Sequence, residues 1–259
     1  MRLIDAQILR IMSKTVILIP SRLSATRLPN KPLLKIDDLS IIQHTYKRAQ
    51  ESKVGKVYVA TGDEEIADEI RKIKGKFILT KIKHKTGTDR IFEAYKKVSK
   101  KLNCKYIINL QGDEPFIDPK DIINLNKSVI SKNSDIGTLA NKISKADFVD
   151  NSIVKVITEN NIKKNKISRA KKFLRNCKYT KKNIFGHVGI YQFRTSILKK
   201  FVSLNQSKNE IKHRLEQLRA IDNNINIDVV FSKNKSFGID TVQDYVEIKK
   251  IMEYKIKKK

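Results

Sequence analysis

The chain has 259 residues, of which 40% are hydrophobic, and this composition is typical of a folded globular protein with a sizeable core. No apolar run reaches the roughly 18 residues that a membrane-spanning helix needs, and Met1–Lys14 lacks the features of a signal peptide. The net charge of +28 suggests nucleic-acid binding, but the lysines are scattered through every segment, so we expect no specific nucleic-acid partner. Two cysteines cannot build a disulfide framework, and reduced thiols and a cytoplasmic location are expected.

The first half of the chain alternates short apolar runs with helical patterns, which is typical of βαβ units. Residues 1–13 precede the first apolar run, and we expect them to form a disordered amino-terminal extension. Strands are predicted at Thr15–Ile19, Val57–Ala60, Phe77–Leu79 and Tyr106–Leu110. Helices are predicted at Ile41–Gln50, Glu64–Lys72, Asp89–Lys101 and Pro119–Ser131. Asp63 and Thr88 are candidate N-caps of the second and third of these helices.

Beyond Asn133 the pattern is richer in strands joined by polar, lysine-rich segments. Strands are predicted at Ile153–Thr158, around Lys166–Arg169, and at Phe185–Tyr191 and Ile227–Phe231. Helices are predicted at Thr195–Phe201, Glu210–Asn223 and Thr241–Lys255. We therefore expect an α/β protein in which one mixed-sheet domain covers residues 14–259 and includes a strand-rich insertion at about residues 140–192.

The loop after the first predicted strand is dense in cationic and hydroxyl side chains. Residues 20–33 read Pro-Ser-Arg-Leu-Ser-Ala-Thr-Arg-Leu-Pro-Asn-Lys-Pro-Leu. Open α/β sheets bind ligands at the carboxyl ends of their strands. Backbone N–H groups beside guanidinium groups can hold a triphosphate. The loop therefore favours a nucleotide site over an ordinary basic surface loop.

Two aspartates in later turns are candidate ligands for a hard cation. Asp113 lies in the segment Gln111–Pro115, directly after a predicted strand, and Asp240 lies in the segment Gly238–Thr241. Mg²⁺ takes oxygen ligands and usually shares them with substrate phosphates. From the residues alone, Asp113 could equally belong to an acidic turn that caps the next helix, and Asp240 could be the N-cap of the closing helix.

Several motifs in a fixed order give the chain a resemblance to a known family. Besides residues 20–33, they are Gly87–Arg90, Gln111–Pro115, Ile167–Ala170, His187–Tyr191, Leu215–Arg219 and Gly238–Thr241. Together they resemble the 3-deoxy-manno-octulosonate (Kdo) cytidylyltransferases, which make CMP-Kdo from CTP and the sugar acid Kdo. The resemblance extends from about Lys14 to Tyr245. The chain departs from the family pattern at Ser21 and Asn30, where alanine and glycine are usual, and it lacks the proline that usually follows Arg169.

The resemblance implies a Rossmann-like nucleotidyltransferase fold, a Mg²⁺-dependent reaction that supplies lipopolysaccharide synthesis, and a homodimer formed through the insertion. It implies that Arg22, Lys31, Asp113 and Asp240 are catalytic and that the two aspartates hold the metal. The CTP-binding residues that it implies are Arg22, Ser24, Thr26, Arg27, Lys31, Gly87 and Thr88. The sugar-acid-binding residues that it implies are Arg90, Gln111, Arg169, His187, Tyr191, Glu216 and Gln217.

Some of these residues also have plainer interpretations. By itself, His187 would more often be a core histidine and Arg90 a surface ion-pair residue. Glu216 and Gln217 would by themselves be part of an exposed helix face. The other histidines are expected to be structural or surface residues, and they are His44, His84 and His213.

Rival functions follow from the same features. The nearest is an enzyme that activates a related sugar acid, such as 8-amino-Kdo or sialic acid. A rival from another class is a basic nucleic-acid-binding protein, which predicts steeply salt-dependent binding and no turnover of CTP.

Overall fold

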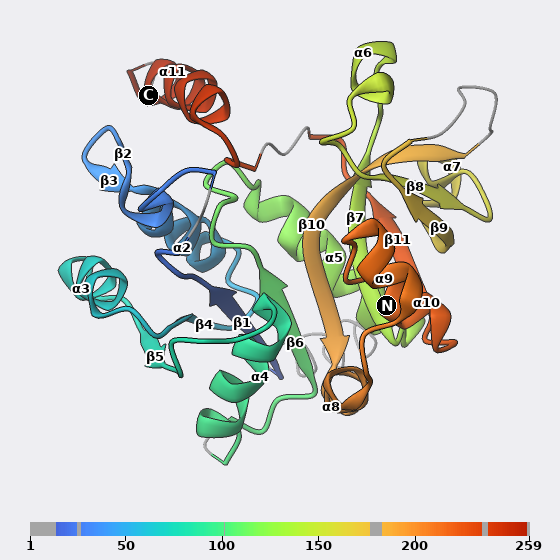
Figure 1. Ribbon diagram of the computed structural model, residues 1–259, viewed down its shortest axis with the longest axis horizontal. Coiled ribbons are helices and arrows are strands. Elements are labelled where there is room, and N and C mark those ends of the chain that lie inside the picture. The colour runs from blue at the N-terminus through green and yellow to red at the C-terminus, as the bar shows by residue number, and fades with distance from the viewer. Residues whose placement is uncertain (1–13, 25–26, 101, 177–182, 235–237, 258–259) are drawn as a thin grey trace, which may run out of the picture. The chain divides into compact units, whose positions relative to one another are not determined.

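The computed structural model describes residues 14–24, 27–100, 102–176, 183–234 and 238–257. These residues separate into two compact units (Figure 1). The first unit combines Ser13–Ile123 with Ser236–Lys259, and the second includes Asn124–Lys235. The amino-terminal extension expected at residues 1–13 lies outside the described residues. The insertion expected at about residues 140–192 falls within the second unit.

The first unit is built on a parallel sheet with the strand order β5–β4–β1–β6. The strands are β1 (Thr15–Pro20), β4 (Lys56–Thr61), β5 (Phe77–Leu79) and β6 (Tyr106–Leu110). Every residue of β1 and β6 is buried, as expected for a parallel sheet that is covered on both faces. All of these strands were predicted from their apolar runs.

Helices connect these strands by crossovers. The helices are α2 (Ile41–Glu51), α3 (Glu64–Lys72) and α4 (Gly87–Val98). Because crossovers between parallel strands are right-handed, α2 and α3 cover one face of the sheet, and α4, which returns the chain past β1 to β6, covers the other (Figure 1). Strands β4 and β5 are added on one side of β1 and strand β6 on the other, so the strand order reverses at β1. Open sheets bind ligands at such a switch point.

The start of α4 differs from its prediction. Thr86 is the N-cap, because its hydroxyl accepts from the backbone N–H of Asp89 at 3.1 Å while the Asp89 carboxylate accepts from the N–H of Thr86 at 3.2 Å. The prediction of Thr88 as the cap was wrong, since this capping box starts the helix two residues earlier. Thr88 is buried instead, and its hydroxyl accepts a hydrogen bond from the Asn109 amide at 3.3 Å.

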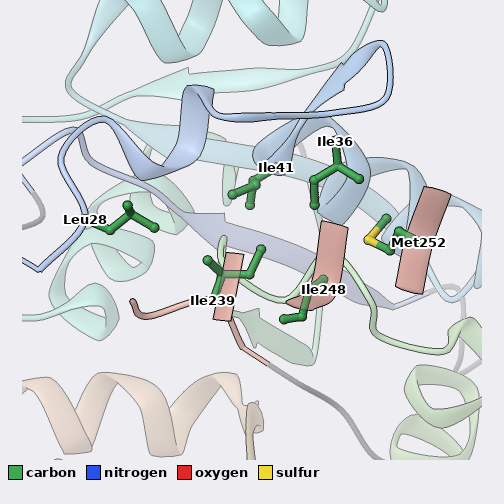
Figure 2. Packing of buried hydrophobic residues seen from close by; sticks show 6 residues of the cluster. All are labelled: Leu28, Ile36, Ile41, Ile239, Ile248 and Met252. Carbon is green, nitrogen blue, oxygen red and sulfur yellow. The ribbon is translucent and has the colours of Figure 1, made fainter. Parts of the chain in front are cut away.

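The closing segment of the chain packs on the region that follows β1. This region contains η1 (Lys31–Leu33), β2 (Lys35–Ile36) and β3 (Leu39–Ser40), and the closing segment contains α11 (Val242–Lys257). Figure 2 shows the buried apolar cluster that joins them, which consists of Leu28, Ile36, Ile41, Ile239, Ile248 and Met252. Burying an aliphatic side chain contributes about 1.5–3 kcal/mol, so this cluster holds the closing segment firmly against the residues after β1.

The second unit is a mixed sheet with the strand order β10–β7–β11–β9–β8, in which β8 also pairs with β10. The strands are β7 (Ile136–Asn141), β8 (Lys155–Thr158), β9 (Ile167–Leu174), β10 (Ile184–Arg194) and β11 (Ile227–Phe231). Strand β7 was not predicted, because its sequence Ile-Gly-Thr-Leu-Ala-Asn is poor in strand-favouring residues. It is a strand because it pairs with β10 on one side and β11 on the other, and it is buried throughout.

The second unit contains a long helix, α5 (Pro119–Lys132), followed by several short ones. Helix α5 begins in the first unit, and the short helices are α6 (Lys145–Val149), α7 (Ile162–Asn165), α8 (Thr195–Ser203), α9 (Lys208–His213) and α10 (Leu218–Asp222). The prediction of a single helix at Glu210–Asn223 was wrong. Arg214 adopts the left-handed conformation (φ 53°, ψ 48°) and ends α9, so the segment forms two helices. None of the described helices is long and apolar enough to cross a membrane.

Candidate active site

An open pocket of about 300 Å³ lies in the first unit at the carboxyl ends of β1 and β6. Its lining comes from segments far apart in the sequence: the loop after β1, the turn before α4, the turn after β6 and the closing segment. The lining residues are Pro20, Ser21, Arg22, Ser24, Arg27, Leu28, Lys31, Pro32, His84, Thr86, Gly87, Arg90, Gln111, Gly112, Asp113 and Asp240. The structure thus brings together most of the residues predicted to bind nucleotide and metal, although Thr88 is not among them and Thr26 lies outside the described residues.

Glycine allows the chain to approach itself closely at the edge of this pocket. A Cβ atom on Gly87 would lie 3.2 Å from Cγ of Pro20, and one on Gly112 would lie 3.0 Å from the carbonyl oxygen of Pro20. The first turn of α4 and the turn after β6 can therefore both lie beside the end of β1. The amino terminus of a helix attracts anions through its unpaired N–H groups and its dipole, so this arrangement suits a phosphate ligand.

In the described part of the chain, three oxygen atoms accept hydrogen bonds from the Lys31 ammonium group. They are Oδ2 of Asp113 at 2.6 Å, the carbonyl oxygen of Ile239 at 2.7 Å and Oδ1 of Asp240 at 3.2 Å. Burial by itself lowers the pKa of Lys31, but the carboxylates of Asp113 and Asp240 outweigh it and raise this pKa above 10.5. Lys31 therefore stays charged, and Arg27 adds an exposed ion pair with Asp240 at 3.1 Å.

The capping roles that the sequence allowed for the two aspartates belong to other residues. At α11, the Thr241 hydroxyl accepts from the N–H of Asp244 at 3.1 Å, and the Asp244 carboxylate accepts from the N–H groups of Asp240 and Thr241. At α5, the carboxylate of Asp118 accepts from the N–H of Lys120 at 2.8 Å. The side chains of Asp113 and Asp240 instead face Lys31.

Backbone contacts bring these aspartates together. The N–H of Ile239 donates to the carbonyl oxygen of Asp113 at 2.9 Å, and the Ile239 side chain is fully buried in the apolar cluster (Figure 2). Gly238 permits this approach, because a Cβ atom there would lie 3.3 Å from Oε1 of Glu114. The position of Asp240 beside Asp113 thus depends on packing between distant parts of the chain.

The oxygen atoms around the Lys31 ammonium group are also suitable ligands for a hard divalent cation. The described residues contain no group of three or more His, Cys, Asp and Glu side chains with the geometry of a metal site. Mg²⁺, however, is commonly held by one or two carboxylates, while water and substrate phosphates complete its coordination shell. Two carboxylates and one carbonyl oxygen already surround a cation here, the Lys31 ammonium group.

The backbone of the loop after β1 is held by an unpredicted contact. Asp63 occupies the predicted N-cap position of α3, but its side chain makes no capping hydrogen bond. Instead, its Oδ2 accepts from the N–H of Leu23 at 3.1 Å. Arg22 and Ser24, on either side of Leu23, are exposed at the pocket.

Arg90 lines the pocket, but its guanidinium group also holds the chain before α4. It donates to the Thr80 hydroxyl at 2.7 Å and to the carbonyl oxygens of Lys81 and Ile82 at 3.1 and 2.8 Å. Arg90 is buried, and this burial lowers its pKa, as does the charge of Arg22. The plainer interpretation of Arg90 as a surface ion-pair residue therefore does not describe its environment.

A second cluster of predicted residues lies in the second unit. The ring of His187 hydrogen-bonds through Nε2 to the Thr138 hydroxyl at 3.0 Å and packs 5.3 Å from the rings of Phe173 and Tyr191. Burial of the ring lowers the pKa of His187 from 6.5 to about 3, so the imidazole is neutral. Burial and, to a smaller extent, the charge of Glu216 raise the pKa of Tyr191 well above 10.

The other predicted sugar-acid residues of the second unit differ in exposure. Gln217 is buried between α9 and α10, where the break at Arg214 places it, rather than on an exposed helix face. Arg169 is exposed on β9, opposite Asp228 of β11.

Residues 16–236 match the family model described as cytidylyltransferase. The chain is 41% identical over 243 residues to a 3-deoxy-manno-octulosonate cytidylyltransferase of Thermodesulfovibrio yellowstonii, with 89% of this chain and 94% of the relative covered. The chain belongs to this family. A second relative of the same name, from Bartonella tribocorum, is 36% identical over 239 residues, with 92% of this chain and 98% of the relative covered.

The fold confirms this membership. It is similar to that of a CMP:2-keto-3-deoxy-manno-octonic acid synthetase solved in complex with CTP, with a TM-score of 0.85, 34% identity, and 94% of this chain and 100% of that chain covered. A UDP-glucose pyrophosphorylase solved with UDP-glucose has a TM-score of 0.71 at 15% identity, covering 93% of this chain and 99% of that chain, a likeness of fold alone. The predicted Rossmann-like nucleotidyltransferase fold is therefore confirmed.

Two groups at this pocket were not predicted from the sequence, the His84 side chain and the carbonyl oxygen of Ile239. His84 was expected to be structural or at the surface, yet it lines the pocket and pairs through Nε2 with Glu93 at 2.8 Å. Its place two residues before the Thr86 capping box was a usable signal. The carbonyl oxygen of Ile239 could not be predicted from the sequence, because every residue type has a main-chain carbonyl group.

Proposed function

We propose that the protein transfers the cytidylyl group of CTP to Kdo, forming CMP-Kdo and diphosphate for lipopolysaccharide synthesis. The observation that carries this proposal is the meeting of cationic and carboxylate side chains at one pocket, in a chain 41% identical to a 3-deoxy-manno-octulosonate cytidylyltransferase. A cationic lining suits a triphosphate, and paired carboxylates suit the metal that accompanies it.

The proposed reaction needs no protein nucleophile. The anomeric hydroxyl of Kdo attacks the α-phosphorus of CTP in line and a new O–P bond forms. The bond from the α-phosphorus to the oxygen that bridges it to the β-phosphorus breaks, diphosphate leaves with that oxygen, and the hydroxyl proton passes to solvent water. Arg22, Arg27 and Lys31 supply positive charge for the triphosphate and for the diphosphate that leaves. Catalysis would then come from positioning and from preorganised charge.

Asp113 and Asp240 are the residues that would hold Mg²⁺. When bound, the metal would neutralise phosphate charge and make the α-phosphorus more susceptible to attack. Their support is the oxygen cradle in which both carboxylates already face a single cation, the Lys31 ammonium group.

We assign the sugar acid to the residues that match the family's acceptor-binding positions, which are Arg90, Gln111, Arg169, His187, Tyr191, Glu216 and Gln217. The Arg169 guanidinium would pair with the carboxylate of Kdo. His187 is neutral and uses Nε2 for the Thr138 hydroxyl, so Nδ1 is its other hydrogen-bonding nitrogen, and Tyr191, Glu216 and Gln217 offer further partners for hydroxyl groups.

Diphosphate release tests the proposal directly. The purified protein is assayed with CTP, Mg²⁺ and, in separate reactions, Kdo, 8-amino-Kdo and sialic acid. We expect the highest kcat/KM with Kdo. A higher value with either of the other sugars would reassign the acceptor, and no release with any of them would contradict the proposed function.

The metal assignment has its own test. We expect Asp113→Asn and Asp240→Asn to abolish turnover with the fold retained, because an amide oxygen carries no charge for the cation. Circular dichroism checks the fold. Near-normal diphosphate release by either variant at ordinary Mg²⁺ concentrations would show that the assignment is wrong. The homodimer implied by the family stays a prediction, which light scattering can check.

A further inference from the structure

The hydrogen bonds of Lys31 occupy all the donors of its ammonium group. An ammonium group has three N–H donors, and the oxygens of Asp113, Ile239 and Asp240 accept from Lys31 at 2.6, 2.7 and 3.2 Å. The Lys31 side chain is only 13% exposed, so the ammonium group is largely shielded from water, while the Asp240 side chain that faces it is half exposed. In this arrangement Lys31 neutralises the carboxylates, and none of its donors is left for a triphosphate.

The same oxygens are the proposed ligands of the divalent cation. An ammonium group and a divalent metal ion cannot share this space, because like charges at such a short separation repel strongly inside a protein, and the double charge of the metal doubles the repulsion. Metal entry therefore requires Lys31 to leave. Its long, flexible stem permits this movement, and a triphosphate in the pocket that Lys31 also lines would give the ammonium group a new anionic partner.

We propose that Lys31 is the resident cation of the metal site, and that it leaves the oxygens of Asp113, Asp240 and Ile239 when a divalent cation and a nucleotide bind together. Because the nucleotide takes up the displaced ammonium group, metal and nucleotide bind with positive coupling, and each raises the affinity for the other by the same factor. This inference rests on the proposed function and adds how its metal site is assembled.

A Mn²⁺ titration without nucleotide measures the competition. Free Mn²⁺ is followed by electron paramagnetic resonance in the metal-free wild type, in Lys31→Met and in Lys35→Met. Lys35 is exposed in β2, so its variant removes the same charge without touching the site. We expect Lys31→Met to bind Mn²⁺ at least about tenfold more tightly than the wild type, and Lys35→Met to bind like the wild type.

Two further variants and a melting experiment show where the gained affinity arises. The double variant Lys31→Met with Asp240→Asn should bind Mn²⁺ less tightly than Lys31→Met alone, because one of the two carboxylates is replaced by an uncharged amide. Lys31→Met in EDTA should melt below the wild type, since its carboxylates then repel each other, and Mg²⁺ should restore the melting temperature. The wild type should respond little to Mg²⁺ alone.

The wild-type chain provides a measurement that needs no destabilising substitution. The ¹⁵Nζ resonance of Lys31, assigned with Lys31→Arg, should be unchanged by Mg²⁺ alone. It should shift when Mg²⁺ is added with a CTP analogue that has a non-hydrolysable α–β bridge.

Equal Mn²⁺ affinity in the wild type and Lys31→Met, or a Lys31 resonance unmoved by Mg²⁺ with the analogue, would overturn the inference. If Asp113→Asn and Asp240→Asn nevertheless abolish turnover, the proposed function stands and only the resident-cation role is wrong. If those variants keep turnover, the proposed metal assignment fails as well.

Discussion

Aspartates that look alike in the sequence have different partners in the structure. Asp63 and Asp240 each precede a helix, and each was a candidate N-cap. Asp63 accepts a hydrogen bond from the backbone of Leu23, while Asp240 faces Lys31. The N-cap of α11 is Thr241, whose hydroxyl forms a capping box with Asp244. At this scale, the role of a residue depends on the partner that the fold brings to it.

The two arginines assigned to different substrates can be separated by kinetics. We expect Arg22→Ala to raise the KM for CTP and Arg169→Ala to raise the KM for Kdo. Losing a charge-assisted contact costs about 1.5–3 kcal/mol, which is roughly a tenfold to hundredfold change. Gln217→Ala should resemble Arg169→Ala with a smaller effect, because a neutral amide makes weaker contacts. An effect of Arg169→Ala on CTP alone would place the acceptor site elsewhere.

The neutral state of His187 predicts a pH dependence of stability. Its pKa is about 3 in the folded protein against 6.5 ordinarily, so the unfolded chain binds the extra proton between these values. Stability due to His187 is therefore present above about pH 6.5 and is lost as the pH falls. From about pH 7.5 to about pH 5 the loss is about 2 kcal/mol. Urea unfolding should show this loss in the wild type in excess of His187→Gln; equal losses would contradict it.

Contacts between elements fix the loop after β1 at its two ends. Near β1, the Leu23 N–H donates to Asp63 at the start of α3. Farther along, Leu28 is buried against the closing segment, beside Ile239 (Figure 2). The exposed cationic residues of the loop therefore project from a backbone that is anchored on both sides, which suits the binding of a flexible triphosphate.

The anchor at Asp63 gives a prediction for this loop. We expect Asp63→Ala to raise the KM for CTP severalfold with a smaller change in kcat, because the Leu23 N–H loses its acceptor and the loop loses order. Asp63→Asn keeps an oxygen acceptor and should retain most of the CTP affinity. Steady-state kinetics with CTP varied at saturating Kdo measures both. If the two variants behave alike, the hydrogen bond to Leu23 is not what matters.

At the scale of the whole molecule, the charge is the most conspicuous feature. The chain carries 55 lysines and arginines against 27 acidic residues. The cationic residues of the pocket are a small part of this excess, and most lysines lie elsewhere along the chain. A diffuse positive charge attracts anionic substrates over short distances and is screened by salt.

This distribution predicts weak, non-specific binding of nucleic acid. We expect fluorescence anisotropy with short DNA and RNA duplexes to show an affinity that falls steeply as salt is raised and that does not depend on sequence. Nanomolar, sequence-selective binding at physiological salt would support the rival interpretation as a nucleic-acid-binding protein.

The amino-acid sequence by itself determined the alternation of strands and helices in the first unit, because apolar runs and helical periodicity are local signals. Its ordered motifs also identified the family. The tertiary structure alone decided that Ile136–Asn141 is a strand and that Arg214 divides a helix. The strand is defined by pairing with β10 and β11, which are distant in the sequence, and arginine rarely adopts the left-handed conformation that ends α9. It alone placed Asp240 and the Ile239 carbonyl around Lys31, because long-range backbone pairing and burial of Ile239 bring the closing segment to the end of β6.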